Sequence, residues 1–389
     1  MDFRYSEEQL ALQDTLQRFI SRDYDFERRR ALARSALGFS AEAWGQYAEL
    51  GLLALPLPEQ FGGLGGNGVD IMAVMETIGQ GLLLEPYLTT VVLCGGLIRD
   101  AASEPVKTSM LPQIAAGKLK IALAAYEAAG RYDLAHVACT AAGTGGGWTL
   151  SGRKAVVLDA PSADCFLVSA RGAGQLADAD GISLFLVPRD APGVTLLAYP
   201  TQSGSRAGDL VLNDVSVGPD AVIGEPGRAL GIIERAVDRA IAALCAEALG
   251  IVTALNQATL NYLKTRKQFG VPIGAFQALQ HRMAEMVIAA EQTRSMAIIA
   301  AVQVDDADAA KRRRAISGAK AYVGQAARFI GQQAVQLHGA MGVVDDSVVS
   351  HYFKRLTMID MSLGDADFHL GRFSEVPVAE RRPSAFAAR

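Results

Sequence analysis

The sequence predicts a mainly α-helical protein with one small β domain in the middle of the chain. Long amphipathic, Ala-rich runs occupy both ends, and short runs rich in Val, Leu, Ile and Phe occupy the middle. A chain of 389 residues also needs two or three packed units. We expect an N-terminal helical domain over 1–117, a middle antiparallel β domain over 118–230, a C-terminal four-helix bundle over 231–375 and a tail over 376–389.

The N-terminal part has the pattern of helices. Ser6 followed by Gln9 is a capping-box pattern, which predicts that a helix begins there. The apolar residues that then recur on one helical face are Leu10, Leu12, Leu16, Phe19 and Ile20. Further on, "FGGLGGNG" contains a formal match to the dinucleotide-binding fingerprint. No βαβ unit surrounds it, so we interpret it as a loop between helices.

The β domain is predicted from five closely spaced runs: "GWTLSGRKAVVLDA", "DCFLVSA", "GISLFLVP", "GVTLLAYP" and "GDLVLNDVSV". No helix-length pattern lies between them, so the sheet should be antiparallel. The dipeptide Ser151-Gly152 predicts a hairpin turn.

The C-terminal part predicts long helices that pack as an antiparallel bundle. The amphipathic runs cover about 229–265, 276–303, 309–338 and 349–372.

Composition excludes several classes of function. The net charge is −4 with mixed signs, so neither nucleic acid nor a membrane surface is an expected partner. The four cysteines and five histidines are dispersed, so we expect no metal site and no disulfide framework. No stretch reaches about 18 uncharged apolar residues, and the N-terminus has no apolar signal core. We therefore expect a cytoplasmic protein without a membrane span.

Two C-terminal segments suggest ligand contacts. In "KTRKQFGVPIGAFQ", Arg266 and Phe269 lie where one helix ends, and a guanidinium with a nearby aromatic ring suits a pyrophosphate and a flat heterocycle. An ordinary turn between helices is the alternative. In "QQAVQLHGAMG", Gln336 precedes Gly339 and Gly342 at a helix end, where small residues let a ligand approach the backbone.

Together these segments resemble the acyl-CoA dehydrogenase family. The resemblance covers nearly the whole chain and includes "LGLLALPLPEQFGGLGG", "YEAAGRYD", "RKQFGVPIGAFQ" and "QLHGAMG" in the family's order. The nearest likeness is to the branch that contains the small subunit of pimeloyl-CoA dehydrogenase. The resemblance implies FAD as cofactor, an acyl-CoA substrate converted to a 2,3-enoyl-CoA, an electron-transferring flavoprotein as electron acceptor, and a homo- or hetero-tetramer.

The resemblance also implies site residues by position. Those matching contacts to the FAD of a neighbouring subunit are Arg266, Phe269, Ile273, Phe276 and Gln277. Those matching the adenine end are Gln336, Gly339 and Gly342. Those in the flavin loops and the C-terminal flavin segment are Tyr126, Leu158, Asp365 and Asp367. Asp238 matches an aspartate on the CoA-facing helix.

The flavin loops depart from the family pattern. The first usually has Thr-Glu-Pro, and here it has Tyr126-Glu127-Ala128. The second usually carries a Trp and a Thr beside the flavin, and here Val156 and Leu158 take those places. Aromatic cover and one side-chain hydrogen bond are lost, which leaves backbone groups to bind FAD.

The catalytic base is the largest departure. The residue before Gly364, usually Glu, is Leu363, and the alternative position two residues after Asp238 is Ala240. Asp365, two residues beyond Leu363, is one candidate substitute. Glu247 is another, because it lies seven residues after Ala240 on the same helical face. A buried acid paired with an arginine is the alternative interpretation of Glu247.

Three hypotheses follow. The chain is an FAD-dependent acyl-CoA dehydrogenase with a displaced carboxylate base, or it is a catalytically deficient partner subunit in a hetero-oligomer. A different flavin chemistry on the same fold, such as oxygenation, is the third. In the segment "GDADFHL", we expect Asp367 to face FAD and His369 to be a helix-surface residue.

Overall fold

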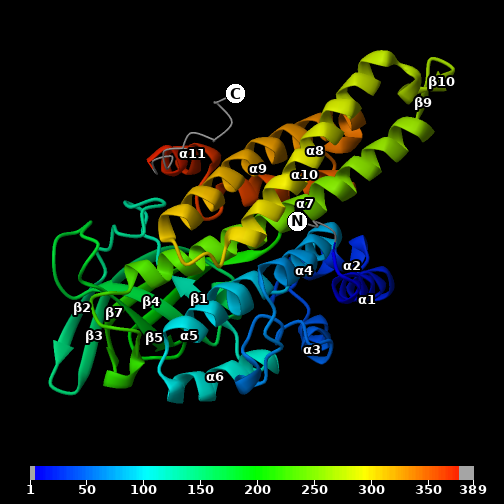
Figure 1. Cartoon of the computed structure of the whole chain (residues 1–389). Coiled ribbons are helices and arrows are strands. Elements are labelled where there is room, and N and C mark those ends of the chain that lie inside the picture. Colours follow the sequence, from blue (N-terminus) through cyan, green and yellow to red (C-terminus); the bar gives the residue numbers. More distant parts are fainter. Residues whose placement is uncertain (1–4, 376–389) are drawn as a thin grey trace, which may run out of the picture.

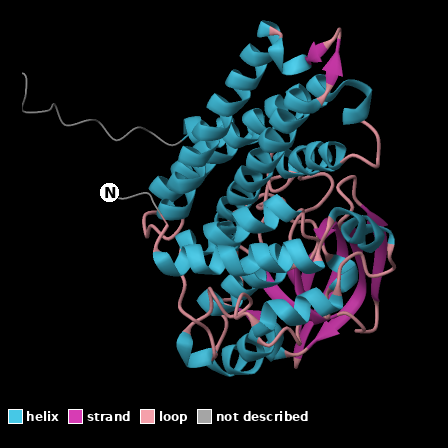
Figure 2. Ribbon diagram, turned by 90° about the vertical axis from the view of Figure 1, so that its right-hand side faces the viewer, coloured by secondary structure: helices cyan, strands magenta, loops and turns pink. Residues whose placement is uncertain are grey.

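The computed structural model describes residues 5–375, which form two helical parts with a β domain between them in sequence. Figure 1 shows the β domain at one end of the long C-terminal helices, with the N-terminal helices packed along their side. Figure 2 shows most strands gathered at the lower right, beside several helices, and a small hairpin at the far tip. The predicted fold class, an N-terminal helical domain, a middle β domain and a C-terminal helical bundle, is confirmed.

The N-terminal helices are α1 (Glu7–Asp23), α2 (Phe26–Arg34), α3 (Ala41–Glu49), α4 (Gly68–Gly81), α5 (Gly96–Ala101) and α6 (Glu104–Ala115). A π-helical segment, η2 (Tyr87–Gly95), precedes α5. The predicted capping box is confirmed: the Ser6 hydroxyl accepts the N–H of Gln9 at 3.2 Å, and the Gln9 amide oxygen accepts the N–H of Ser6 at 3.0 Å.

The β domain holds one sheet of eight strands. They are β1 (Ile121–Ala124), β2 (Thr140–Thr144), β3 (Gly147–Leu158), β4 (Cys165–Arg171), β5 (Ile182–Pro188), β6 (Val194–Pro200), β7 (Arg206–Val217) and β8 (Val222–Ile223). Their order is β6-β7-β3-β2-β4-β5-β8, with β1 paired to β4. Most pairs are antiparallel, as predicted, but β1 and β2 both run parallel to β4. A purely antiparallel sheet was therefore the wrong expectation. The β2–β3 hairpin reverses the chain and the connection from β3 to β4 reverses it again, so β4 runs in the direction of β2.

The predicted turn at Ser151-Gly152 is wrong. Both residues lie inside β3, where the pairing with β7 shifts its register between Leu150 and Gly152. Gly152 has φ +147°, and a Cβ there would lie 2.7 Å from the Cα of Cys139. A glycine inside a strand often marks a bulge or a close backbone approach, and here it marks both.

The C-terminal part contains α7 (Leu230–Thr265), α8 (Gln277–Gln303), α9 (Ala309–His338), α10 (Val348–Met361) and α11 (Ala366–Glu375). A short hairpin of β9 (Lys267–Gln268) and β10 (Val271–Pro272) follows α7. The single last helix expected over 349–372 is two helices, because Leu363 and Gly364 have positive φ angles of 58° and 112°. The break places Leu363 in a loop rather than on a helix.

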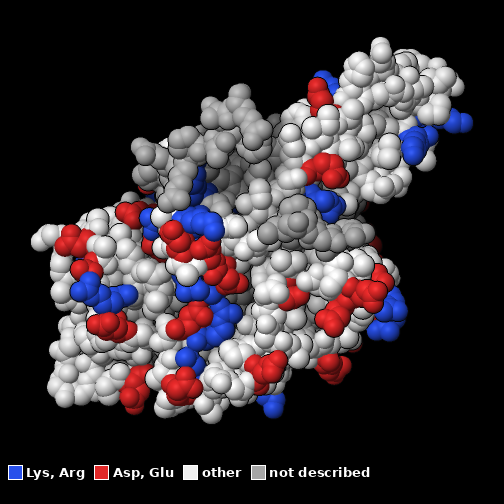
Figure 3. All heavy atoms as spheres, viewed as in Figure 1, with Lys and Arg blue, Asp and Glu red and all other residues white. Residues whose placement is uncertain are grey.

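Helix α7 is long and apolar enough to meet the length and composition criteria of a membrane span, but 83% of its most apolar window is buried inside the protein. It is the central core helix of the fold. On the face shown in Figure 3, acidic and basic side chains lie interspersed.

Helices α4 and α7 cross at two glycines. A Cβ on Gly79 would lie 2.1 Å from the carbonyl oxygen of Glu247, and one on Gly250 would lie 1.8 Å from the carbonyl oxygen of Glu76. Backbone therefore packs directly on backbone, and this crossing fixes the position of α7 against the N-terminal helices.

We predict that Gly250→Ala lowers the free energy of unfolding by about 1–3 kcal/mol or more, because overpacking would force the two helices apart. Gly231→Ala on the same helix is the control, since a Cβ there meets no atom within 4 Å. Urea unfolding of both variants measures the difference. Equal stability of the two variants would contradict the close crossing.

Candidate active site

A cavity of about 390 Å³ lies where the β domain meets η2 and the end of α10. Residues from four segments line it, among them Tyr126, Arg131, Tyr132, Val156, Leu158 and Leu363. Its walls are mainly aliphatic and aromatic. The structure thus gathers both flavin loops and the usual base position around one cavity.

The two usual base positions are apolar and buried. Leu363 lines the cavity and has only a small exposed surface, while Ala240 on α7 is fully buried. Neither side chain can accept a proton, so the cavity has no base at either position.

The loop that carries Leu363 is held by two buried side chains. The Lys320 ammonium donates to the carbonyl oxygens of Asp360 and Gly364 at 2.8 and 2.6 Å. The His369 ring contacts the Leu363 carbonyl oxygen through Nε2 at 3.0 Å and the Ser317 hydroxyl through Nδ1 at 3.2 Å. Because a carbonyl can only accept, Nε2 carries the proton.

His369 is therefore a fully buried residue, and its interpretation as a surface residue was wrong. Burial lowers the pKa of His369 to about 3, so the ring is neutral, and burial also lowers the pKa of Lys320 to about 8. Lys320 was not among the residues predicted from the sequence, where its one signal was its place among the small residues of "SGAKAYVG".

The two aspartates of this segment have different surroundings. The Asp365 carboxylate accepts the N–H of Phe368 at 2.9 Å, which caps the start of α11. Asp367 is exposed on the first turn of α11. Asp365 as base and both residues as FAD contacts stay predictions.

Glu247 is paired with Arg355, an arginine that was not identified from the sequence. Arg355 on α10 donates from Nε and Nη2 to the two Glu247 carboxylate oxygens at 2.5 and 2.7 Å. This geometry matches the alternative interpretation of Glu247 as a buried, paired acid. A role of Glu247 as base stays a prediction that would require this pair to open.

A second cavity of about 50 Å³ adjoins the first, and Thr89 and Leu158 line both. Asp159 and the Glu247–Arg355 pair border it. The Thr89 hydroxyl donates to the Asp159 carboxylate at 2.7 Å. Burial raises the pKa of Asp159 from its ordinary 3.8 to about 6, against the opposing effects of that hydrogen bond and of Arg355.

We predict that Asp159→Asn stabilises the fold by roughly 1–3 kcal/mol above pH 6. The folded carboxyl binds its proton more tightly than the unfolded one, so the wild type loses stability as the pH rises from about 4 to 6. Asn stays neutral and keeps an acceptor for Thr89. Urea unfolding at several pH values should show a gain that grows over this interval and then levels off, whereas a pH-independent difference would contradict the shift.

Val156, in the place of the family's Trp, is half-exposed and has φ +52°. A β-branched residue in this left-handed region is strained. Its N–H donates to the Asp209 carboxylate at 3.1 Å, which holds the distorted strand.

The second group of predicted FAD contacts lies at the other end of α7. Arg266 caps the end of α7, and Phe269 lies in the turn of the β9–β10 hairpin. Phe269 is 91% exposed, and its backbone has φ +56°. Phe276 contacts this ring edge-on at 6.1 Å, and Ile273 and Gln277 lie beside it in sequence. Stacking of Tyr262 on His338 at 4.4 Å brings the end of α9, with Gln336, Gly339 and Gly342, next to the end of α7.

The two groups cannot surround one ligand within a single chain. Helix α7 has 36 residues, which at about 1.5 Å per residue spans roughly 54 Å. Figure 1 shows the β9–β10 hairpin at the tip farthest from the β domain. Contact of both groups with one cofactor would therefore require a second chain.

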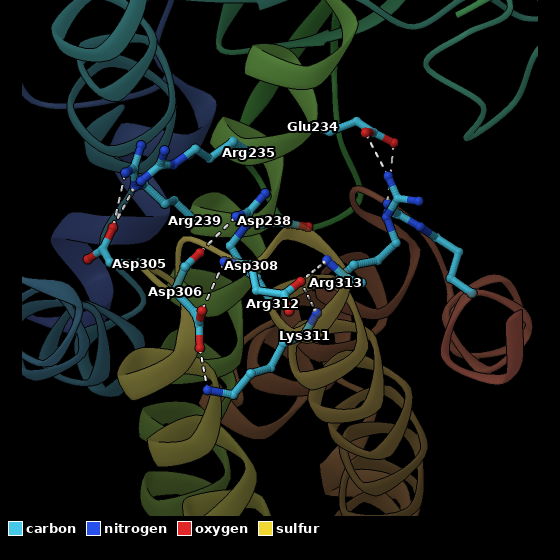
Figure 4. A network of polar contacts seen from close by, with 12 residues as sticks. Glu234, Arg235, Asp238, Arg239, Asp305, Asp306, Asp308, Lys311, Arg312 and Arg313 are labelled. Carbon is cyan, nitrogen blue, oxygen red and sulfur yellow. Dashed lines mark hydrogen bonds and ion pairs between the residues drawn. The ribbon is translucent and has the colours of Figure 1, made fainter. Parts of the chain in front are cut away.

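Asp238 on α7 lies in a network of ion pairs rather than in the cavity wall (Figure 4). Arg312 donates to the buried Asp238 carboxylate at 3.0 Å, and Arg313 pairs with Glu234 at 2.7 Å. The network joins α7 to the start of α9. Substrate contact by Asp238 stays a prediction.

Sequence models of the acyl-CoA dehydrogenase N-terminal, middle and C-terminal domains match residues 6–118, 122–215 and 227–375. The mitochondrial short-chain specific acyl-CoA dehydrogenase of Bos taurus is 29% identical over 335 residues, 85% of this chain and 80% of that protein.

Two solved structures are similar over almost their full length. One is the ChsE4-ChsE5 complex from Mycobacterium tuberculosis, with a TM-score of 0.88 and 27% identity over 96% of this chain and 98% of that one. The other is the FAD complex of PigA, with a TM-score of 0.88 and 25% identity over 96% and 98%. With all three domain models matched in order, this chain belongs to the acyl-CoA dehydrogenase family.

Proposed function

We propose that this chain is the base-deficient subunit of a hetero-oligomeric, FAD-dependent acyl-CoA dehydrogenase. A sister chain supplies the catalytic carboxylate, and this chain donates Arg266 and Phe269 to the flavin that the sister holds. One observation carries the proposal: both base positions, Leu363 and Ala240, are buried and apolar, while the Arg266–Phe269 hairpin projects into solvent. The assembly would convert an acyl-CoA to a 2,3-enoyl-CoA.

The division of chemistry follows from these residues. Bound FAD would supply the acceptor for the hydride from the substrate's β carbon. The Arg266 guanidinium suits a phosphate of the cofactor, and the exposed Phe269 ring suits a flat heterocycle. The ChsE4-ChsE5 relative is itself a complex of two chains, which supports a hetero-oligomer.

We further propose a cytoplasmic hetero-tetramer that passes electrons to an electron-transferring flavoprotein. We also propose that the chain belongs to the small-subunit branch of pimeloyl-CoA dehydrogenase, which would imply a sister chain of the same fold. The acyl chain is left open by this proposal.

The second candidate function is a dehydrogenase that uses a displaced base within this chain. The observation in its favour is that Asp365 lies in the same loop as Leu363, two residues on. It would have to release the N–H of Phe368 to turn toward the cavity.

Expression of the chain alone and together with a neighbouring homologue tests both candidates. We expect anaerobic bleaching of the flavin by an acyl-CoA only when the sister is present. Bleaching of equal extent by the chain alone would overturn the partner-subunit proposal and favour the displaced base, with Asp365→Asn as the follow-up.

A further inference from the structure

Two aromatic rings are in contact at one side of the cavity. Tyr132, which lines the cavity, lies in the loop after β1, and Phe368 lies on the first turn of α11. Their ring centroids are 5.3 Å apart with the planes at 51°. The Arg372 guanidinium packs over the Phe368 ring, 5.7 Å from its centroid. The β domain and the bundle therefore touch directly, where the family's two flavin-contacting segments would hold a cofactor between them.

The Phe368 side of this contact is rigid. The N–H of Phe368 is bonded to Asp365, and the next residue, His369, is fully buried and bonded on both ring nitrogens. The Lys320 ammonium donates a hydrogen bond to the carbonyl oxygen of Gly364, shortly before Phe368 in the chain. The backbone at Phe368 therefore cannot move away without breaking these hydrogen bonds.

The Tyr132 side is held at both ends of its loop. Glu127 accepts from the fully buried Lys154 ammonium at 2.7 Å and from the N–H groups of Ala138 and Cys139. At the far end, the buried Arg171 donates to two carbonyl oxygens of the loop, those of Ala135 at 2.8 Å and Val137 at 3.2 Å. The Tyr132–Phe368 pair thus joins a hydrogen-bonded loop of the β domain to a hydrogen-bonded segment of the helical bundle.

Several donors on the cavity wall are also committed to the protein. A flavin ring needs hydrogen bonds along its polar edge. The engaged groups are the N–H of Ala155 with the Tyr126 carbonyl, the N–H of Val156 with Asp209, the Thr89 hydroxyl with Asp159, and the Ser362 hydroxyl with the Met358 carbonyl. Leu158 offers no hydroxyl. These groups of η2, β3 and α10 therefore offer no free donor to the polar edge of FAD.

We propose that this chain's own cavity excludes FAD, with the Tyr132–Phe368 pair as the obstacle, so that the assembly carries one FAD for every two chains. This inference rests on the proposed function, since the flavin that remains is the one held by the sister chain. It adds that the two flavin sites of a pair are not equivalent.

The first test is the FAD content of the purified hetero-oligomer at saturating FAD, measured by absorbance after denaturation and compared with the amount of each chain. We expect one FAD per pair of chains. One FAD per chain would overturn the inference.

The second test opens the site. The variant Tyr132→Ser/Phe368→Ala/Leu158→Thr removes both rings and adds a hydroxyl donor, and we expect its FAD content to rise above one per pair. Leu158→Thr alone is the matched control and should leave the content unchanged. Leu370→Ala, an exposed position on the same helix, controls for general loosening of α11. A triple variant that folds and still binds one FAD per pair would overturn the role of the two rings.

Different results would overturn the donation of Arg266 and the exclusion of FAD from this chain's cavity. If Arg266→Ala leaves the flavin content and FAD affinity of the assembly unchanged, the proposed donation of this residue is wrong, although half occupancy could stand. If Arg266→Ala releases the flavin but the wild type holds one FAD per chain, the exclusion is wrong and the donation stands.

Discussion

Arg355→Met should lower the free energy of unfolding by about 3–5 kcal/mol, because it leaves the Glu247 carboxylate buried without its partner. Both carboxylate oxygens accept from this one guanidinium, at 2.5 and 2.7 Å. The buried carboxyl of Asp159 would also lose a favourable positive charge. Urea unfolding at pH 7.5 measures the loss.

The double variant Glu247→Met/Arg355→Met is the decisive control. Replacing both partners by apolar side chains of similar length removes the charges together, which is often neutral or stabilising for buried pairs. We expect the double variant to recover most of the stability that the single variant loses. If the single and double variants were equally unstable, Arg355 would act through packing rather than through its charge.

The Glu247–Arg355 pair shows a limit of prediction from the sequence. The period of α7 placed Glu247 on a buried face, and an arginine partner was one of two interpretations. Which arginine it was could not follow from the sequence, since Glu247 and Arg355 lie 108 positions apart on different helices. Long-range pairs of this kind depend on how α7 and α10 pack, and periodicity describes only one helix at a time.

His369 illustrates a second limit. Its neighbours Asp367 and Leu370 are exposed, so the local pattern gave no reason to expect burial. Burial is decided by Ser317 on α9 and by the carbonyl of Leu363, which the chain reversal at Gly364 turns toward the ring. The long helices needed no such information, because their apolar faces repeat over many turns.

Arg266→Ala in the assembly should weaken FAD binding roughly 10- to 150-fold, the equivalent of losing a charge-assisted hydrogen bond of about 1.5–3 kcal/mol. The side chain is exposed at the end of α7, so its removal should cost little stability. Lys267→Ala, the adjacent exposed cation, is the matched control for net charge and should bind FAD as the wild type does.

Arg266→Lys separates charge from shape, because a lysine keeps the positive charge but lacks the planar fork that pairs with a phosphate. FAD titration of the apo-assembly, followed by flavin fluorescence, should rank the wild type above the Lys variant and the Lys variant above the Ala variant. Equal weakening by Lys267→Ala would mean that the hairpin acts only as a diffuse positive charge. The expected order instead requires the hairpin of this chain to reach the flavin of its neighbour. The hairpin cannot reach the cavity of its own chain, because α7 is roughly 54 Å long.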